Sequence, residues 1–373
     1  MNATRSIDLE DTERLLAADR EGLLRAASSA GAQVRTVAAA VDEGALDPLR
    51  ADDRPRSVIW VAGRGTAETA GTILAATLGG TASQPFTLTG EAPPWVGPLD
   101  VLIIAGDDPG DPALVAAAAA GVRRGARVVV AAPFEGPLRD STAGRVAVLS
   151  PRLWVPDEFG LCRYLAAGLA VLHAVDPRPS VDLALLADEL DAEALRNSAA
   201  RELFTNPAKT LAARIGERQV ALAGDSAATL ALARHGSSAL LRIAHHVTAA
   251  TCLADAVVAL RSGASAGFGA GFEDPDAALF HDEEIDGPLP QRLRVLALAL
   301  TAERTVVAAR LAGLDDADLV AAEDVPEGPD AAVGLIGSDG SRGSAGAQRP
   351  EQQLAVLAVR LEMAAVYMRL VRG

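Results

Sequence analysis

The chain has 373 residues, enough for two domains of ordinary size, with a formal net charge of −15 and a pI near 4.8. This acidic balance disfavours binding to nucleic acid and to anionic membranes. Half of the residues are hydrophobic but only 3% are aromatic, so we expect a core of Ala, Leu and Val. The first residues lack the apolar segment of a signal peptide, and no apolar stretch reaches the ~18 residues of a membrane span. We therefore expect a soluble cytoplasmic protein.

The first half of the chain alternates short apolar runs with helical patterns. Residues 8–43 have the periodicity of a helix pair, and the runs SVIWVAG and DVLIIAG each end in glycine, which is typical of buried strands. Strands that are apolar throughout fit a parallel sheet with both faces covered. The predicted strands are 57–63, 85–88, 100–106, 126–133 and 145–150, and the predicted helices between them are 65–80 and 111–124.

The second half repeats this plan after two long helical patterns at 157–175 and 181–197. A Gly/Ser-rich loop at 338–350 is expected to be mobile. The chain is therefore predicted to contain two α/β subdomains, residues 1–180 and residues 181–373. The strands predicted in the second are 218–224, 293–300 and 318–324, and the helices are 225–246, 303–313 and 350–370.

The glycine loop VAGRGTAE is the first candidate binding loop. Gly63 and Gly65 lie between a predicted strand and a predicted helix, where backbone N–H groups can approach a ligand. Arg64 and Thr66 could add donors. The loop is a poor dinucleotide fingerprint, because Glu68 occupies the place of the third glycine. The alternative is a tight turn that binds nothing.

The loop AGDDPGDPAL, after the next predicted strand, is acidic. Its carboxylates, from Asp107, Asp108 and Asp111, only accept hydrogen bonds when ionised and would repel a phosphate dianion. We expect Asp108 or Asp111 to cap the following helix, with Pro112 near the first helical position. This loop is predicted not to bind a bare phosphate.

The order of these motifs carries a family resemblance. GRGT, AGDDPGDPAL and ARVVVAAP in the first half, NPAK in the second and the closing VYMRLVRG together resemble the sugar isomerase (SIS) proteins. The chain is similar to the bifunctional phosphoglucose/phosphomannose isomerase family, and to its divergent actinobacterial TobH-type branch. The resemblance implies two SIS-like subdomains, each a parallel sheet flanked by helices, a sugar or sugar-phosphate ligand and a homodimer.

Compared with the family's motifs, this chain has lost the residues expected to act. Thr66 and Ala67 replace the Gly-Ser of the family's first loop, GMGGSA, and the aspartate loop replaces the hydroxyls of SYSGNTEET. The resemblance places Leu241 where the family has its catalytic Glu and Val257 where it has its catalytic His. The remaining candidates for proton transfer are His245, His246 and Glu68.

No cofactor and no metal are predicted. His281 lies in an acidic run that could offer oxygen ligands to a hard cation, but the spacing matches no known metal loop, and a solvated acidic turn explains it. Cys162 and Cys252 are expected to be free thiols, since two cysteines make no disulfide framework.

Three functions remain open. The first is a SIS-fold protein that binds a carbohydrate derivative and has weak or lost isomerase activity. The second is an active aldose–ketose isomerase of glucose 6-phosphate or mannose 6-phosphate with relocated catalytic residues. The third is a dimeric scaffold without catalysis, for which the apolar helices at 157–175 and 350–370 could supply the contact.

Overall fold

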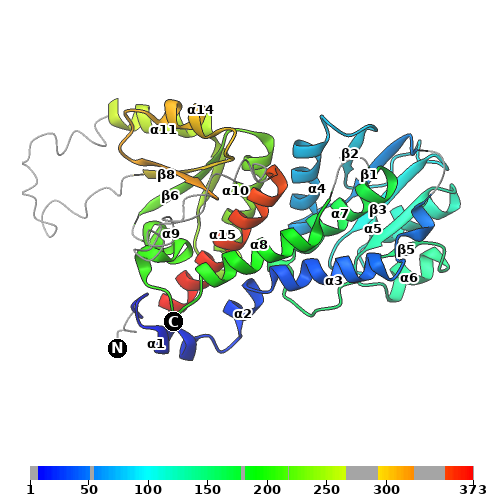
Figure 1. The fold of residues 1–373 in the computed structure, drawn as a ribbon. Coiled ribbons are helices and arrows are strands. Elements are labelled where there is room, and N and C mark those ends of the chain that lie inside the picture. The colour runs from blue at the N-terminus through cyan, green and yellow to red at the C-terminus, as the bar shows by residue number, and fades with distance from the viewer. Residues whose placement is uncertain are drawn as a thin grey trace, which may run out of the picture.

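Two parallel sheets organise the chain, as Figure 1 shows. The computed structural model describes residues 7–50, 54–177, 181–216, 218–265, 293–322 and 349–372. The predicted loops around His281 and after residue 337, up to residue 348, lie outside these ranges. Two parallel sheets with flanking helices confirm the predicted fold class.

The first sheet has the strand order β2-β1-β3-β4-β5, and every neighbouring pair is parallel. Three of its strands, β1, β3 and β4, are buried along nearly their whole length, which explains their uninterrupted apolar sequences. Its strands are β1 (Ser57–Val61), β2 (Phe86–Thr89), β3 (Asp100–Ala105), β4 (Arg127–Ala131) and β5 (Ala147–Val148).

The second sheet has the order β7-β6-β8-β9 and is also parallel throughout. One of its strands, β7, was missed by the sequence analysis, because AATC is short and lacks large apolar residues. The strands are β6 (Gln219–Gly224), β7 (Ala249–Cys252), β8 (Leu293–Ala299) and β9 (Ala317–Ala321).

Helices cover both sheets, and the longest lies between them. Residues 8–43 were expected to form two helices, but the structure has three. The Asp19 carboxylate accepts hydrogen bonds from the N–H groups of Leu23 and Leu24, and an additional helix begins there. None of the described helices is both long and apolar enough to cross a membrane. The α-helices are α1 (Thr12–Ala18), α2 (Leu23–Ala27), α3 (Ala30–Asp42), α4 (Gly65–Leu78), α5 (Pro112–Arg123), α6 (Gly136–Thr142), α7 (Leu161–Val175), α8 (Leu183–Arg196), α9 (Pro207–Gly216), α10 (Ala227–Ala244), α11 (Leu253–Ser265), α14 (Arg304–Leu311) and α15 (Pro350–Arg372). The short 3₁₀ helices are η1 (Asp47–Leu49), η2 (Asp157–Phe159) and η3 (Leu203–Thr205).

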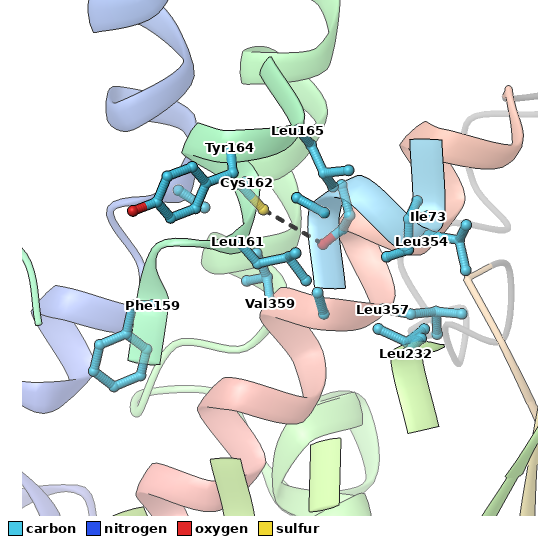
Figure 2. Close-up of a cluster of buried hydrophobic side chains, with 14 of the residues drawn as sticks. Ile73, Phe159, Leu161, Cys162, Tyr164, Leu165, Leu232, Leu354, Leu357 and Val359 are labelled. Carbon is cyan, nitrogen blue, oxygen red and sulfur yellow. Dashed lines mark hydrogen bonds between the residues drawn. The ribbon is translucent and has the colours of Figure 1, made fainter. Parts of the chain in front are cut away.

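Helix α15, red in Figure 1, runs between the two halves and is buried on nearly all sides. Figure 2 shows its leucines beside Cys162 and Leu165 of α7, Ile73 of α4 and Leu232 of α10. The apolar side chains of α7 and α15 are therefore already covered within one chain. The expectation that these two helices supply a dimer contact is wrong.

An ion pair fixes α15 in this apolar setting. Arg360 donates from Nε to Oε1 of Glu193, 2.8 Å away, and both side chains are almost fully buried. The rest of the guanidinium donates to the carbonyls of Ala321 and Ala322, at the end of β9. Burial alone would raise the pKa of Glu193, but Arg360 and Arg196 outweigh it and hold the pKa below its usual value. The pair ties α8, α15 and the second sheet together.

A second buried pair joins α15 to α10. His235 Nε2 lies 2.8 Å from Oε1 of Glu362, and both side chains are buried. Burial raises the pKa of Glu362, and His235 offsets part of that rise. The pKa of the Cys162 thiol is raised well above its usual value, mainly by burial and to a smaller extent by the nearby charge of Glu362.

The NPAK motif closes the loop before α9. The Asn206 side chain accepts from the N–H of Lys209 and donates to the carbonyl of Ser198. Lys209 Nζ donates to the carbonyls of Ala199 and Arg201, each 2.8 Å away. Burial lowers the pKa of Lys209. The Asn206 and Lys209 side chains of the motif therefore hold the loop in place through hydrogen bonds to its backbone groups.

We predict that Arg360→Met destabilises the protein by about 3–5 kcal/mol, because it leaves the Glu193 carboxylate buried without its main partner. The control is Arg35→Met, which removes the exposed pairs of Arg35 with Asp188 and Asp191 and is expected to lose at most about 1 kcal/mol. Urea unfolding measures both. An Arg360→Met loss no larger than that of the control would contradict the structural role of the buried pair.

Candidate functional site

The candidate site lies where β1 and β3 end. Strand β1 connects to β2 on one side and lies beside β3 on the other, so the strand order reverses between β1 and β3. Ligands of open α/β sheets bind at such a reversal, outside the carboxyl ends of the strands. The two loops singled out from the sequence, 62–66 and 105–112, follow these two strands.

The first loop leads directly into α4. Gly65 has a φ of 66°, in the left-handed region that favours glycine. No side chain caps the N-terminus of α4, so its first N–H groups are left for another acceptor. Thr66 turns away from this role, because its hydroxyl donates to the carbonyl of Asp157, 3.1 Å away. The first N–H groups of α4 in the predicted binding loop thus have no side-chain acceptor, while the Thr66 hydroxyl is hydrogen-bonded to η2.

The acidic loop caps its own helix. Asp111 accepts from the N–H of Ala113 at 2.9 Å, and Pro112 is the first residue of α5, so the predicted cap is confirmed. Asp108 accepts from the N–H of Gly110 at 2.8 Å. Both carboxylates also face Arg64 of the first loop, at 3.3 Å from Asp108 and 3.8 Å from Asp111. The sequence analysis missed this pairing between the loops.

A third wall comes from the second half of the chain. Arg242, at the end of α10, donates to Asp157 at 2.7 Å and to Glu158 at 3.0 Å. Burial would lower the pKa of Arg242, but these partners, with Asp107 nearby, raise it above its usual value. Asp107 itself has no hydrogen bond or ion pair among the described residues. The site is therefore built by both halves of the chain.

Tyr164, on the first turn of α7, lies close to Thr66 of the first loop, because both flank Gly160. Its side chain is only 1% exposed, and its hydroxyl has no hydrogen-bond partner in the described part of the chain. The Arg163 guanidinium lies 4.1 Å from the centre of its ring. Burial raises the pKa of Tyr164; Arg163 opposes the rise, while Asp107 and Asp157 add to it. The only sequence signal was rarity, since the chain has two tyrosines.

No hydrogen bond or ion pair among the described residues links Glu68 to His245 or His246, the candidates for proton transfer. His245 ends α10 with a φ of 50° and is exposed, and His246 accepts from Arg372 through Nδ1 at 2.9 Å. The pKa of His246 is lowered, mainly by burial and to a smaller extent by the positive charge of Arg372. Glu68 is exposed on the first turn of α4, and no recorded interaction in the described ranges joins it to either histidine. Leu241 is exposed on α10.

The matching strand end of the second sheet is closed. A Cβ at Gly224 would lie 2.2 Å from the N–H nitrogen of Leu230, so the helix packs directly on the strand. Ser226 and Thr229 form a capping box that satisfies the N-terminus of α10, and Asp225 pairs with Arg310. This loop leaves no free helix N-terminus for a ligand.

In the described ranges no group of three or more His, Cys, Asp or Glu side chains is arranged to hold a metal ion. Cys162 is a buried free thiol, and Cys252 is half-buried with its thiol 3.0 Å from Asp255.

We predict that Asp111→Ala lowers the free energy of unfolding by about 1 kcal/mol, because α5 loses its N-cap. Asp111→Asn keeps a capping oxygen and is expected to stay within about 0.5 kcal/mol of the parent. Urea unfolding distinguishes them. If the Asn variant loses as much as the Ala variant, the charge facing Arg64, and not the cap, carries the contribution of Asp111.

Known proteins match this chain in structure but not in sequence. No family model and no curated protein matches the sequence. A glucose-6-phosphate isomerase like protein from Thermus thermophilus is 18% identical, with a TM-score of 0.54 over 98% of this chain and 96% of its own. A tagatose-6-phosphate ketose/aldose isomerase from Escherichia coli is 15% identical, with a TM-score of 0.54 over 97% and 92%.

The third comparison is the C-terminal domain of a glucosamine-fructose-6-phosphate aminotransferase from Francisella tularensis, 10% identical, with a TM-score of 0.55 over 94% of this chain and 96% of that one. At these identities the likeness concerns the fold alone. Over almost its whole length, the chain has the two-subdomain, SIS-like fold of these sugar-phosphate proteins.

Proposed function

We propose that this protein binds a carbohydrate derivative at the ends of β1 and β3 and has little or no isomerase activity. The observation that carries the proposal is the pairing of Arg64 with Asp108 and Asp111. The site keeps its position at the strand reversal and its uncapped α4 N-terminus. Its one loop arginine, however, is engaged by the loop that would otherwise receive an anion.

Electrostatics argue against a phosphate in this place. A carboxylate at ~4 Å from an anion meets about 1 kcal/mol of repulsion per charge pair in water, and about 4 kcal/mol at an effective dielectric of 20. Asp107, Asp108 and Asp111 all lie on the one loop, and the Arg64 charge is already shared between two of them. The attraction that the few N–H groups at the start of α4 offer a phosphate does not outweigh its repulsion by several carboxylates.

The chemistry of isomerisation needs a base and an acid close to the sugar. Leu241 and Val257 occupy the positions that the family resemblance assigns to them, and neither side chain moves a proton. The alternative, an isomerase that uses His245, His246 and Glu68, requires groups that no hydrogen bond or ion pair in the described ranges links. Membership of the TobH-type branch and a cytoplasmic location remain part of this proposal.

We also propose a homodimer through a groove beside the N-terminal helices. The groove is about 470 Å³ and is lined by Leu16 of α1, Leu24 of α2 and Leu195 of α8. Leu16 is 56% exposed and Leu195 is 68% exposed. Apolar side chains exposed around an apolar groove are typical of an interaction surface, and a second copy would cover them.

For the dimer, Leu195→Glu is expected to shift the protein to monomer at micromolar concentration, because it puts a charge into the buried contact. Val258→Glu on α11, at a side chain 62% exposed and outside the groove, is the control and should leave the mass unchanged. Light scattering reads both. A parent protein that is already monomeric would refute the dimer.

For the ligand site, we predict no turnover of glucose 6-phosphate or mannose 6-phosphate in coupled assays. Titration with glucose 6-phosphate without added metal should show no micromolar binding. The double variant Asp107→Ser and Asp108→Gly removes two repelling charges and should bind this phosphate more tightly than the parent. Turnover by the parent protein would make the active isomerase the better reading, and micromolar binding without turnover would contradict the exclusion of phosphate from this site.

A further inference from the structure

Asp107 of the acidic loop acts electrostatically on Tyr164, and the Arg163 guanidinium lies against the ring of the same tyrosine. Asp107 has no partner among the described residues, and Arg163 has no ion pair there. The hydroxyl of Tyr164 is buried and has no hydrogen-bond partner in the described part of the chain. Figure 2 shows this hydroxyl on the side of the ring that faces away from Cys162. A buried phenol without a partner is uncommon, and a ligand can supply the missing bond.

The surroundings of Tyr164 place it at the loops. A Cβ built at Gly160 would lie 3.4 Å from Cε2 of the tyrosine ring and 3.2 Å from the Thr66 hydroxyl, so both face the same small space. Thr66 is bound to Asp157, and Arg242 is bound to Asp157 in turn. Asp107 acts electrostatically on both Tyr164 and Arg242. The orphan hydroxyl therefore belongs to the candidate site.

The hydrogen-bonding characters of these groups are complementary. A carboxylate accepts only, a guanidinium donates only, and a phenol does both. Two neighbouring hydroxyls of a sugar match this set, because one can donate to Asp107 while the other accepts from Arg163 or Tyr164. A phosphate dianion only accepts hydrogen bonds and offers no donor to Asp107.

The charge balance points the same way. The loops and the residues around them carry an excess of two negative charges, since they hold five carboxylates and three guanidiniums. The carboxylates are those of Asp107, Asp108, Asp111, Asp157 and Glu158, and the guanidiniums are those of Arg64, Arg163 and Arg242. A neutral ligand avoids the repulsion that a dianion meets there.

We infer that the site binds neighbouring hydroxyls of an unphosphorylated sugar, and that Asp107, Arg163 and Tyr164 determine this specificity. The inference rests on the proposed function and narrows its ligand class. Tyr164 is then a binding residue whose hydroxyl is left unpaired until the sugar arrives.

Calorimetric titration of the full chain with glucose and mannose, each against its 6-phosphate, tests the inference. The free sugars should bind at least about tenfold more tightly than the phosphates. Tyr164→Phe should weaken binding of the free sugar about five- to tenfold, and Asp107→Asn about tenfold or more. Tyr164→Phe should leave the melting temperature unchanged or raise it, because it removes an unsatisfied buried group.

The matched control is Tyr367→Phe. Tyr367 is the other tyrosine, also buried, and its hydroxyl donates to the carbonyl of Asn197 at 2.6 Å. This variant should lower the melting temperature and leave sugar affinity unchanged. A loss of affinity in Tyr164→Phe alone therefore separates binding from folding.

The outcomes separate the two proposals. If the 6-phosphates bind without turnover and the free sugars do not bind, the inference is overturned and the carbohydrate-binding function stands. If Tyr164→Phe binds the free sugar as tightly as the parent protein does, the inference is likewise overturned and the carbohydrate-binding function stands. If none of the four sugars binds, the proposed function fails and takes the inference with it.

Discussion

The buried pair between Glu193 and Arg360 is the constraint on which the arrangement of the two halves depends. An apolar helix such as α15 could rotate among its neighbours with little change in buried area, but a buried guanidinium has one place where all its donors are satisfied. With Arg360 fixed on α8 and β9, Glu362 on the same helix meets His235 of α10. Helix α10 then carries Arg242 to η2. The position of Arg242 beside the candidate site thus depends on the Arg360–Glu193 pair, through the packing of α15 against α10.

The two strand-end loops show how one architecture supports opposite outcomes. In the second sheet, Ser226 and Thr229 satisfy the helix N-terminus, and Gly224 lets the helix pack directly on the strand. In the first sheet, α4 has no such cap, and Gly65 at its start adopts a left-handed φ. Charges from other elements surround that open end. A difference of a few side chains, on the same fold, therefore leaves one helix N-terminus without a side-chain cap and closes the other.

The sequence predicted what depends on neighbours along the chain. The apolar strands β1, β3 and β4 and the cap of α5 by Asp111 followed from local patterns and were confirmed. What it missed depends on distant packing. Arg64 meets Asp108 across two loops, and Arg242 meets Asp157 across the two halves. The expected dimer helices failed for the same reason, because an apolar helix surface does not reveal whether its partner is the same chain or another copy. The binding and catalytic residues were not tested by the fold, and they remain proposals.

The NPAK loop has a consequence for chemical labelling. Lys209 is the single lysine of the chain, and its Nζ is held by two backbone carbonyls in a buried position. Acylating reagents react with a free, unprotonated amine that they can reach, so the folded surface offers them no lysine side chain. Only opening of the loop around Ala199 and Arg201 would expose that amine. The rate at which Lys209 is acylated would then report local opening of this loop at one residue, without any engineered probe.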